Sequence, residues 1–183
     1  MKTVLVANQK GGVGKTTVSD EIAFALERRG YKVSFQNLDP QGGVLHAPTL
    51  PKDDDDFLIV DTPPTLHKDF AEWCRAADLI VMPTRASTLD QIPLMRCWDK
   101  AVKSKTKAHL GIAVNFYDKR RLADSDFLRY LANCEMPVWT TIPTTTAIVQ
   151  AQAAQMSIYE FNKKNKAAAA FEELCDRIIK EVG

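Results

Sequence analysis

The chain has few of the residues that build metal sites or covalent frameworks. Its 183 residues include three widely separated histidines and four cysteines, none of them in a C-x-x-C pair. This spacing argues against a zinc site and against a disulfide framework. We therefore expect the histidines to be surface or satisfied core residues, and we expect the cysteines to be buried and unpaired in a reducing cytosol. These cysteines are Cys74, Cys97, Cys134 and Cys175.

Long apolar runs and a strong charge imbalance are also lacking. No apolar run reaches the ~18–20 residues of a membrane span, and the start "MKTVLVANQK" is typical of a first strand, not of a signal peptide. The net charge is +1, so any nucleic-acid contact requires a local basic patch. The one charge run, "DDDD" at 53–56, is expected to be a solvated turn and not a metal site. No repeat or second domain is evident, so residues 1–183 are expected to form one domain.

What the sequence does contain is an alternation of β-type and helical patterns. Short runs rich in β-branched residues predict strands, and apolar residues at helical spacing predict helices. This alternation predicts an α/β fold, a mostly parallel twisted sheet with helices on both faces. The expected strands are 3–7, 32–39, 56–64, 78–84, 108–118 and 137–143. The expected helices are 16–30, 70–77, 89–105, 122–134, 147–161 and 166–182.

The segment "QKGGVGKTT" at 9–17 joins the first strand to the first helix. Glycines let such a loop curl so that its N–H groups face phosphate oxygens, and the helix N-terminus adds partial positive charge. The lysine is expected to reach the β- and γ-phosphates and the threonine hydroxyl to bind Mg²⁺. The predicted nucleotide-binding residues here are Gly11, Gly12, Val13, Gly14, Lys15, Thr16 and Thr17. Two features are irregular: Gln9 stands where the usual pattern has glycine, and Lys10 is an additional lysine.

Two aspartates close predicted strands on the ligand side of the sheet. Asp61 ends the apolar run "FLIVD", where a carboxylate is expected to hold Mg²⁺ through water. Asp39 in "NLDPQGG" is expected to orient the attacking water, or alternatively to be a turn residue before Pro40. The predicted metal site, partly through water, therefore consists of Thr16, Asp39 and Asp61.

These segments resemble the ParA/MinD group of P-loop ATPases. "KGGVGKTT" matches the deviant Walker A motif of that group. "LDPQGG" (38–43) and "LIVDTPP" (58–64) match its switch I and Walker B/switch II segments, in the right order. "NQ" before Lys10 resembles ParA partition proteins, whereas MinD proteins usually have "SG". Later matches, such as 140–161, extend the resemblance over nearly the whole chain.

The resemblance implies a weak ATPase that uses ATP and Mg²⁺ and dimerises around ATP. In this family, Lys10 would contact the phosphates of the partner subunit. ATP brings about four negative charges and Mg²⁺ offsets two, so an additional cation is favourable. Without such a partner, Lys10 would repel Lys15. Adenine is expected to contact Asn115, Pro143 and Thr144. The catalytic residues implied are Lys10, Lys15 and Asp39.

Three features depart from the family pattern. Asn37 stands where members often have aspartate, but the aspartate linked to hydrolysis is matched by Asp39. The segment between Gly43 and Asp56 is short, which predicts fewer strands. The chain also begins at the first strand, without the helix-turn-helix extension of larger plasmid ParA proteins, so we do not expect it to repress an operator by itself.

Sequence-independent DNA binding by an ATP dimer requires a basic patch facing phosphates. Three basic runs are candidates, although each is alternatively a solvated face. The first contains Lys100, Lys103, Lys105 and Lys107, and the second contains Lys119, Arg120 and Arg121. We favour the third run together with two residues of the second. The resulting DNA-binding candidates are Arg120, Arg121, Lys163, Lys164 and Lys166.

The last helix has an apolar stripe, but its polar face is mainly acidic, which suits core packing better than a lipid surface. We therefore expect no membrane attachment, and a cytoplasmic, nucleoid-associated protein. A ParB-like partner would stimulate hydrolysis, and the cargo would be a plasmid, a chromosome or another body. Alternatives are a dethiobiotin-synthetase-like metabolic enzyme, a MinD-like positioning ATPase and an iron–sulfur relative.

Overall fold

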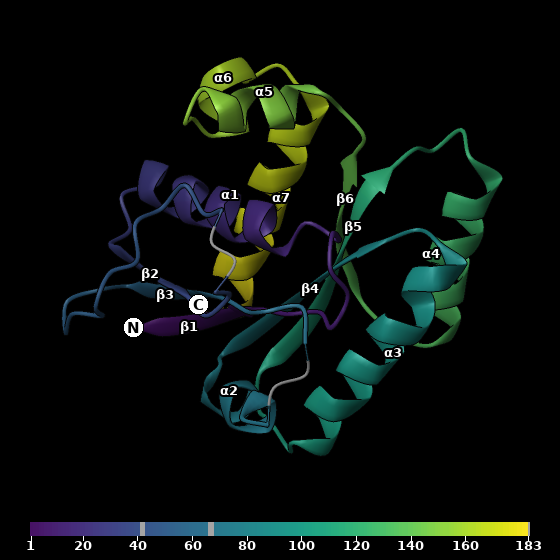
Figure 1. Ribbon diagram of the computed structural model, residues 1–183, viewed down its shortest axis with the longest axis horizontal. Coiled ribbons are helices and arrows are strands. Elements are labelled where there is room, and N and C mark those ends of the chain that lie inside the picture. The colour runs from purple at the N-terminus through teal and green to yellow at the C-terminus, as the bar shows by residue number, and fades with distance from the viewer. Residues whose placement is uncertain (41–42, 66–67, 183) are drawn as a thin grey trace.

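A computed structural model describes residues 1–40, 43–65 and 68–182 of the chain. Six strands, each parallel to its neighbours, form one sheet in the order β2-β3-β1-β4-β5-β6 (Figure 1). The strands are β1 (Lys2–Val6), β2 (Val33–Asn37), β3 (Phe57–Asp61), β4 (Leu79–Arg85), β5 (His109–Tyr117) and β6 (Val138–Pro143). The predicted α/β fold is confirmed.

Helices cover both faces of the sheet. Residues of α1 and α7 share one buried cluster with the strands, and residues of α2, α3 and α4 share the other. The first face carries α1 (Lys15–Arg28), α5 (Ala147–Ala153), α6 (Ile158–Asn162) and α7 (Lys166–Val182). The second carries α2 (Phe70–Ala76), α3 (Thr88–Lys103) and α4 (Leu122–Asn133).

The central strands are apolar along their length because both faces are covered. Every residue of β3, with the sequence FLIVD, is buried. Parallel sheets covered by helices on both sides typically have such continuous apolar strands. The charged residue that ends β3 is therefore an exception, and it needs polar partners.

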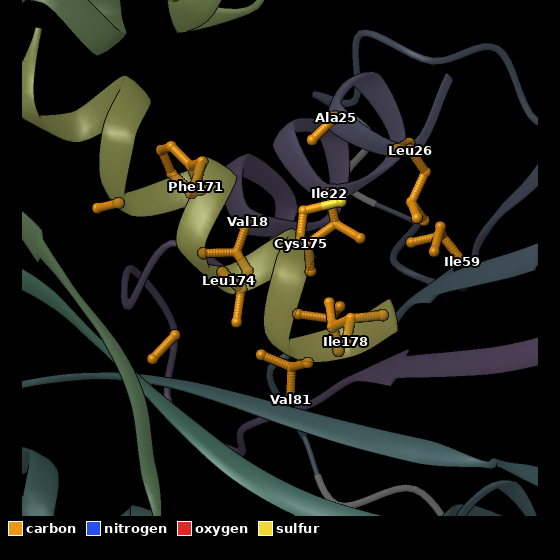
Figure 2. Close-up of a cluster of buried hydrophobic side chains, with 14 of the residues drawn as sticks. Val18, Ile22, Ala25, Leu26, Ile59, Val81, Phe171, Leu174, Cys175 and Ile178 are labelled. Atoms are coloured by element: carbon orange, nitrogen blue, oxygen red, sulfur yellow. The ribbon is translucent and has the colours of Figure 1, made fainter. Parts of the chain in front are cut away.

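On the first face, α1 packs against α7. Figure 2 shows Ile22 and Leu26 of α1 near Cys175 and Ile178 of α7, with Val81 of β4 beneath them. The four helical residues are fully buried. Truncating Ile22 or Ile178 to alanine typically costs about 2–5 kcal/mol at such positions. The apolar stripe of the last helix is thus part of the core, and it is not free to contact lipid.

The single helix expected over 147–161 is wrong. The chain forms two short helices, α5 and α6, separated by a turn in which Gln155 has a φ of 56°. Ser157 starts α6 with a capping box, in which its side chain accepts from the backbone of Glu160 while the Glu160 side chain accepts from the Ser157 N–H. The sequence contains this S-x-x-E pattern, which indicates a helix N-terminus. Apolar residues at helical spacing continue on both sides of it, so a single helix was expected.

Smaller expectations also change. Cys134 is exposed, because it lies just after the end of α4, whereas the other three cysteines are buried; all four are free thiols. In the acidic run, Asp55 is buried and accepts from Ser34 and Lys52, so the run is not wholly solvated. No helix or strand forms between residues 43 and 56. Residues 41–42 of the "LDPQGG" motif and His67 lie outside the described residues.

Candidate functional site

The strand register brings three motifs to one level of the sheet. Val6, the last residue of β1, is the register partner of Asp61 in β3, and Asp61 is in turn the partner of Asn37 in β2. Because these strands are parallel, the loops that follow them leave from the same edge. The glycine loop, residues 38–40 and Asp61 therefore meet at the carboxyl edge of the sheet.

Two glycines shape the loop that leads into α1. Gly12 has a φ of 72° and Gly14 a φ of 90°, in the region that side chains disfavour. At Gly14 space is limiting as well: a Cβ there would come within 2.2 Å of the Asn115 side-chain nitrogen. Gly14 is the residue immediately before α1, so the first N–H groups of the helix face the loop.

The irregular start of the loop is fixed to neighbouring elements. Asn8 donates from Nδ2 to the Pro83 carbonyl at 2.8 Å, and its Oδ1 accepts from the Lys10 N–H at 3.0 Å. Gln9 donates from Nε2 to the carbonyl of Pro93, inside α3, at 2.9 Å. Gln9, which stands where the usual pattern has glycine, thus links the loop to α3 through this hydrogen bond.

Lys15 is a buried cation at the first position of α1, with 6% of its surface exposed. Its Nζ lies 3.3 Å from the Lys10 carbonyl oxygen, to which it donates. Burial lowers the pKa of Lys15, and the carboxylates of Asp61 and Asp39 act in the opposite direction. A buried ammonium held by the phosphate loop is an environment that an anionic ligand would stabilise.

Asp61 is completely buried and receives two hydroxyl hydrogen bonds from α1. Thr16 donates to Oδ2 at 2.7 Å and Ser19 to Oδ1 at 3.2 Å. Burial raises the pKa of Asp61 to about 6, although these hydrogen bonds and Lys15 oppose that rise. Ser19 was missed by the sequence analysis, although its spacing of three from Thr16 puts both hydroxyls on one face of the helix.

The structure brings Asp39 to the same edge of the sheet. Its carboxylate is close enough to Lys15 to favour the charged lysine, and its N–H donates to the Asn37 side chain at 2.8 Å. Asn37, which departs from the family pattern, therefore shapes the turn that presents Asp39. Lys15, Thr16 and Asp61 therefore lie together at this edge, and Asp39 lies on the same side of the site.

Asn115 and Thr17 contact protein groups. Asn115 is 4% exposed and donates to the Val13 carbonyl at 3.2 Å, so it braces the phosphate loop from β5. The Thr17 hydroxyl accepts from Gln152 of α5 at 3.0 Å. The sequence analysis missed Gln152, because nothing in the pattern around it distinguishes it from other surface glutamines. The contact of Asn115 with adenine stays a prediction.

Pro143, the last residue of β6, and Thr144, which follows it, border a groove of about 750 Å³. Thr144 is tied to the end of β5, since its N–H donates to Tyr117 and its hydroxyl to the Phe116 carbonyl. The groove also collects DNA-binding candidates from two distant runs. Its walls include Lys119, Arg120, Arg121 and Lys166 together with Asp118 and Glu173.

The DNA-binding candidates differ in their partners. Arg120 forms a two-bond pair with Asp118, with Nε–Oδ1 at 3.0 Å and Nη2–Oδ2 at 2.8 Å. Arg121 and Lys166 are exposed on the groove. Lys163 and Lys164 are exposed but do not line it. The groove therefore brings together Arg120, Arg121 and Lys166 of the predicted DNA-binding residues. Asp118 neutralises the charge of Arg120.

The described residues contain neither a group of side chains suited to a metal ion nor a membrane-spanning helix. No group of three or more histidine, cysteine, aspartate or glutamate side chains is arranged to hold a metal ion there. In the same part of the chain, no helix combines the length and the hydropathy needed to cross a bilayer.

Comparison with known proteins connects this site to one family. The sequence model described as "CobQ/CobB/MinD/ParA nucleotide binding domain" matches residues 4–158. The maintenance of carboxysome distribution protein A of Halothiobacillus neapolitanus is 27% identical over 212 residues, covering 98% of this chain and 95% of the relative. The chromosome-partitioning ATPase Soj of Thermus thermophilus is 25% identical over 241 residues, covering 100% and 97%. Both alignments are longer than this chain, so the relatives carry residues that it lacks.

A solved structure shares the fold over the whole chain. The septum site-determining protein MinD of Pyrococcus horikoshii, complexed with Mg-ADP, has a TM-score of 0.82 at 18% identity. The match covers 100% of this chain and 97% of that protein. At this identity the likeness shows the common fold.

Proposed function

This chain belongs to the CobQ/CobB/MinD/ParA nucleotide-binding domain family, and we propose that it is a ParA-type ATPase that positions a cargo. The observation that carries the proposal is the cluster at the carboxyl edge of the sheet, where the buried Lys15 lies beside the Thr16–Asp61 pair. Among the described residues, Lys15 is buried without a direct ion pair to a carboxylate, and such a lysine suits a phosphate group. The names of the two relatives, one for carboxysome distribution and one for chromosome partitioning, support a positioning role.

Thr16 and Asp61 fit a magnesium ion that accompanies ATP. Mg²⁺ prefers oxygen ligands, and in such sites one or two protein groups bind together with substrate phosphates and water. The raised pKa of Asp61 reflects a carboxylate that lacks full charge compensation, which a cation would provide. When bound, Mg²⁺ neutralises charge on the phosphates. Thr16 and Asp61 would hold it, and Asp39 lies on the same side of the site.

We assign hydrolysis to Asp39 and Lys15. Asp39 is half-buried at the end of the segment that follows β2, where its carboxylate is suited to orient a water molecule. Lys15 would stabilise charge on the β- and γ-phosphates. The adenine base would lie near Asn115, Pro143 and Thr144, beyond the end of β5.

Lys10 is the residue we assign to dimerisation. Its backbone N–H and carbonyl are both engaged within the loop, yet its ammonium has no hydrogen bond or ion pair among the described residues. Three apolar side chains are exposed at the same edge: Leu38 directly follows β2, Leu89 lies at the start of α3 after β4, and Phe116 is near the end of β5. A second copy facing this edge across ATP would cover them and accept Lys10.

The remaining parts of the proposal concern partners. The ATP dimer would bind duplex DNA without sequence preference, which would associate it with the nucleoid. A ParB-like protein would bind the dimer and accelerate hydrolysis. Such a cycle couples ATP turnover to attachment and release, so that a bound cargo is moved or spaced.

The test compares the wild type with Lys10→Ala and Asp39→Ala in ADP and in ATP. Light scattering measures mass, and fluorescence anisotropy measures binding to a random 30-base-pair duplex at fixed salt. We expect a DNA-bound dimer for the wild type only in ATP, and a monomer for Lys10→Ala. Asp39→Ala is expected to stay dimeric, with hydrolysis reduced roughly 100-fold or more, as for loss of a general base. Lys52→Ala, which removes an exposed lysine outside the site, is the control.

A wild-type protein that remains monomeric in ATP and ignores DNA would contradict the proposal. Turnover that requires a small carboxylic-acid substrate, and that DNA does not affect, would favour a metabolic enzyme of the same fold.

A further inference from the structure

A second basic site lies between α2 and the C-terminal half of α3. The two helices are in contact, and they border a cleft of about 300 Å³. Four of its lining residues are cationic, and the others are apolar or neutral. We call it the α2–α3 cleft, and it is lined by Lys68, Phe70, Ala71, Arg75, Lys100, Lys103 and Ser104.

The cations of the α2–α3 cleft are not neutralised within the described part of the chain. Lys68, Arg75, Lys100 and Lys103 are all exposed and form no ion pair there. Among the described residues, no carboxylate lines the cleft; Asp69, Glu72 and Asp99 are on the same segments but are not part of its lining. In contrast, the groove beside β6 contains two carboxylates, and Asp118 there pairs with Arg120.

Helix electrostatics accounts for only part of this arrangement. Lysine or arginine in the last turn of a helix interacts favourably with the helix dipole, which applies to Arg75, Lys100 and Lys103. Lys68 precedes α2 and gains nothing from that effect. The convergence of three segments on one cleft without any acidic residue therefore suggests an external anion.

The α2–α3 cleft faces away from the nucleotide site. α2 ends at Ala76 just before β4, and α3 ends at Lys103 before β5, so both helices end at the amino edge of the sheet. The phosphate loop lies at the opposite, carboxyl edge. A second copy that covers the carboxyl edge would leave the cleft accessible in both subunits, and two clefts would then act together.

We propose that the α2–α3 cleft binds the phosphodiester backbone of duplex DNA. This inference rests on the proposed function, and it assigns DNA contact to Arg75, Lys100 and Lys103 in place of the groove beside β6. The charged groups that line the cleft are all lysine or arginine, which suit phosphate oxygens. No asparagine or glutamine lines it, so it has none of the amide side chains that read adenine, in keeping with sequence-independent binding. The exposed Lys105 and Lys107 extend the basic surface along the following loop.

The experiment compares two triple variants of the full chain. The cleft variant carries Arg75→Gln, Lys100→Gln and Lys103→Gln. The matched control carries Lys52→Gln, Arg96→Gln and Lys180→Gln, which also removes three exposed positive charges, one arginine and two lysines, outside the cleft and the groove beside β6. Binding of both variants and of the wild type to a random 30-base-pair duplex is measured in Mg-ATP between 50 and 200 mM salt. Mass in ATP and basal hydrolysis are measured without DNA, and binding to poly-glutamate is measured in parallel.

We expect the cleft variant to lose at least tenfold in DNA affinity at about 100 mM salt. The slope of log K against log[salt] should become less negative by roughly 2–3 in this variant, because each lost phosphate contact contributes about 0.9 to the slope. The control variant should stay within twofold of the wild type, and mass and basal hydrolysis should be unchanged in both.

Three results would overturn the assignment. Wild-type affinity in the cleft variant, or equal losses in both variants, would exclude the cleft as the main DNA contact while the proposed function stands. Loss of poly-glutamate binding with DNA binding retained would assign the cleft to an acidic peptide. Absence of DNA binding by a dimeric wild type would remove this inference and the DNA part of the proposed function together.

Discussion

Asn115 of β5 donates from Nδ2 to the carbonyl of Val13 at 3.2 Å, joining two parts of the chain 102 residues apart. The same nitrogen occupies the space that a side chain at Gly14 would need. The conformation of the phosphate loop therefore depends on β5, a strand that is distant from the loop in the sequence. The contact makes Gly14 the most restricted position of the loop.

Gly14→Ala is expected to destabilise the fold and abolish ATP binding. A left-handed φ costs a non-glycine residue about 1–2 kcal/mol, and displacing the Asn115 amide adds roughly 1–3 kcal/mol of overpacking. Urea unfolding and a fluorescent ATP analogue measure the two effects. Gly30→Ala is the control, because Gly30 has a φ of 85° but open space around it. Equal losses in both variants would contradict the role of Asn115.

Ser19→Ala is expected to weaken magnesium-dependent nucleotide binding by roughly tenfold, the lower range for loss of a group that orients a metal ligand. Ser19 donates to Asp61, and this bond opposes the rise of the Asp61 pKa. Its loss should favour the protonated carboxyl at neutral pH. Calorimetric titration of ATP at several Mg²⁺ concentrations measures the change. Ser125→Ala on α4 is the control, and an unchanged Mg²⁺ dependence would refute the prediction.

His46 is expected to stabilise the protein below neutral pH. Its burial lowers its pKa, but hydrogen bonds with Asp20 at 3.0 Å and Glu27 at 3.3 Å outweigh burial and raise the pKa to about 9. A pKa raised above the ordinary 6.5 gives stability that is complete below pH 6.5 and is lost as the pH rises through 9. Because Glu27 is partly exposed, we expect about 1–2 kcal/mol.

The measurement is urea unfolding of the wild type and His46→Gln at pH 6, 8 and 10. The difference between them should shrink as the pH rises. Arg96→Gln, at an exposed position of α3, is the control. A difference that is constant with pH would show that His46 is neutral in the folded protein.

Glu21 should destabilise the folded protein at neutral pH, where His46 stabilises it. This carboxyl is 3% exposed; Oε1 accepts from the Ile158 N–H at 2.8 Å, and Oε2 has no partner among the described residues. Burial raises its pKa from 4.5 to about 7, so stability present below pH 4.5 is lost as the pH rises through 7. Between pH 4.5 and 8, the free energy of unfolding of the wild type should fall by roughly 1–3 kcal/mol more than that of Glu21→Gln. Thermal unfolding measures it, with Glu72→Gln as an exposed control, and parallel pH profiles would contradict it.

Thiol labelling should distinguish Cys134 from the other cysteines. Cys134 is exposed, whereas burial raises the pKa of Cys74 to about 11 and the pKa values of Cys97 and Cys175 to about 12. Because the thiolate is the reactive form, we expect one fast-reacting thiol in the native protein and four after unfolding. Cys134→Ser should remove the fast phase. A second fast thiol would show that one of the buried cysteines is accessible in solution.

Local patterns in the sequence determined most of the fold. Each strand and all but one of the expected helices follow from periodicity, and the phosphate loop follows from glycine spacing between a strand and a helix. Asp61 was predicted correctly to end a strand at the carboxyl edge of the sheet, where parallel strands place their ends together. The helix break near Ser157 was missed because helical spacing continues on both sides of it.

What the sequence by itself determined was the set of elements, their order, and the loop that a phosphate requires. Only the tertiary structure decided which distant side chains support that loop: Gln9 against Pro93, Asn115 against Val13 and Gln152 against Thr17. It also brought Lys68 and Arg75 to the lysines of α3. The physical reason is that periodicity and turn chemistry act between near neighbours in the chain. Contacts between distant residues depend on strand order and helix packing, which leave no local pattern.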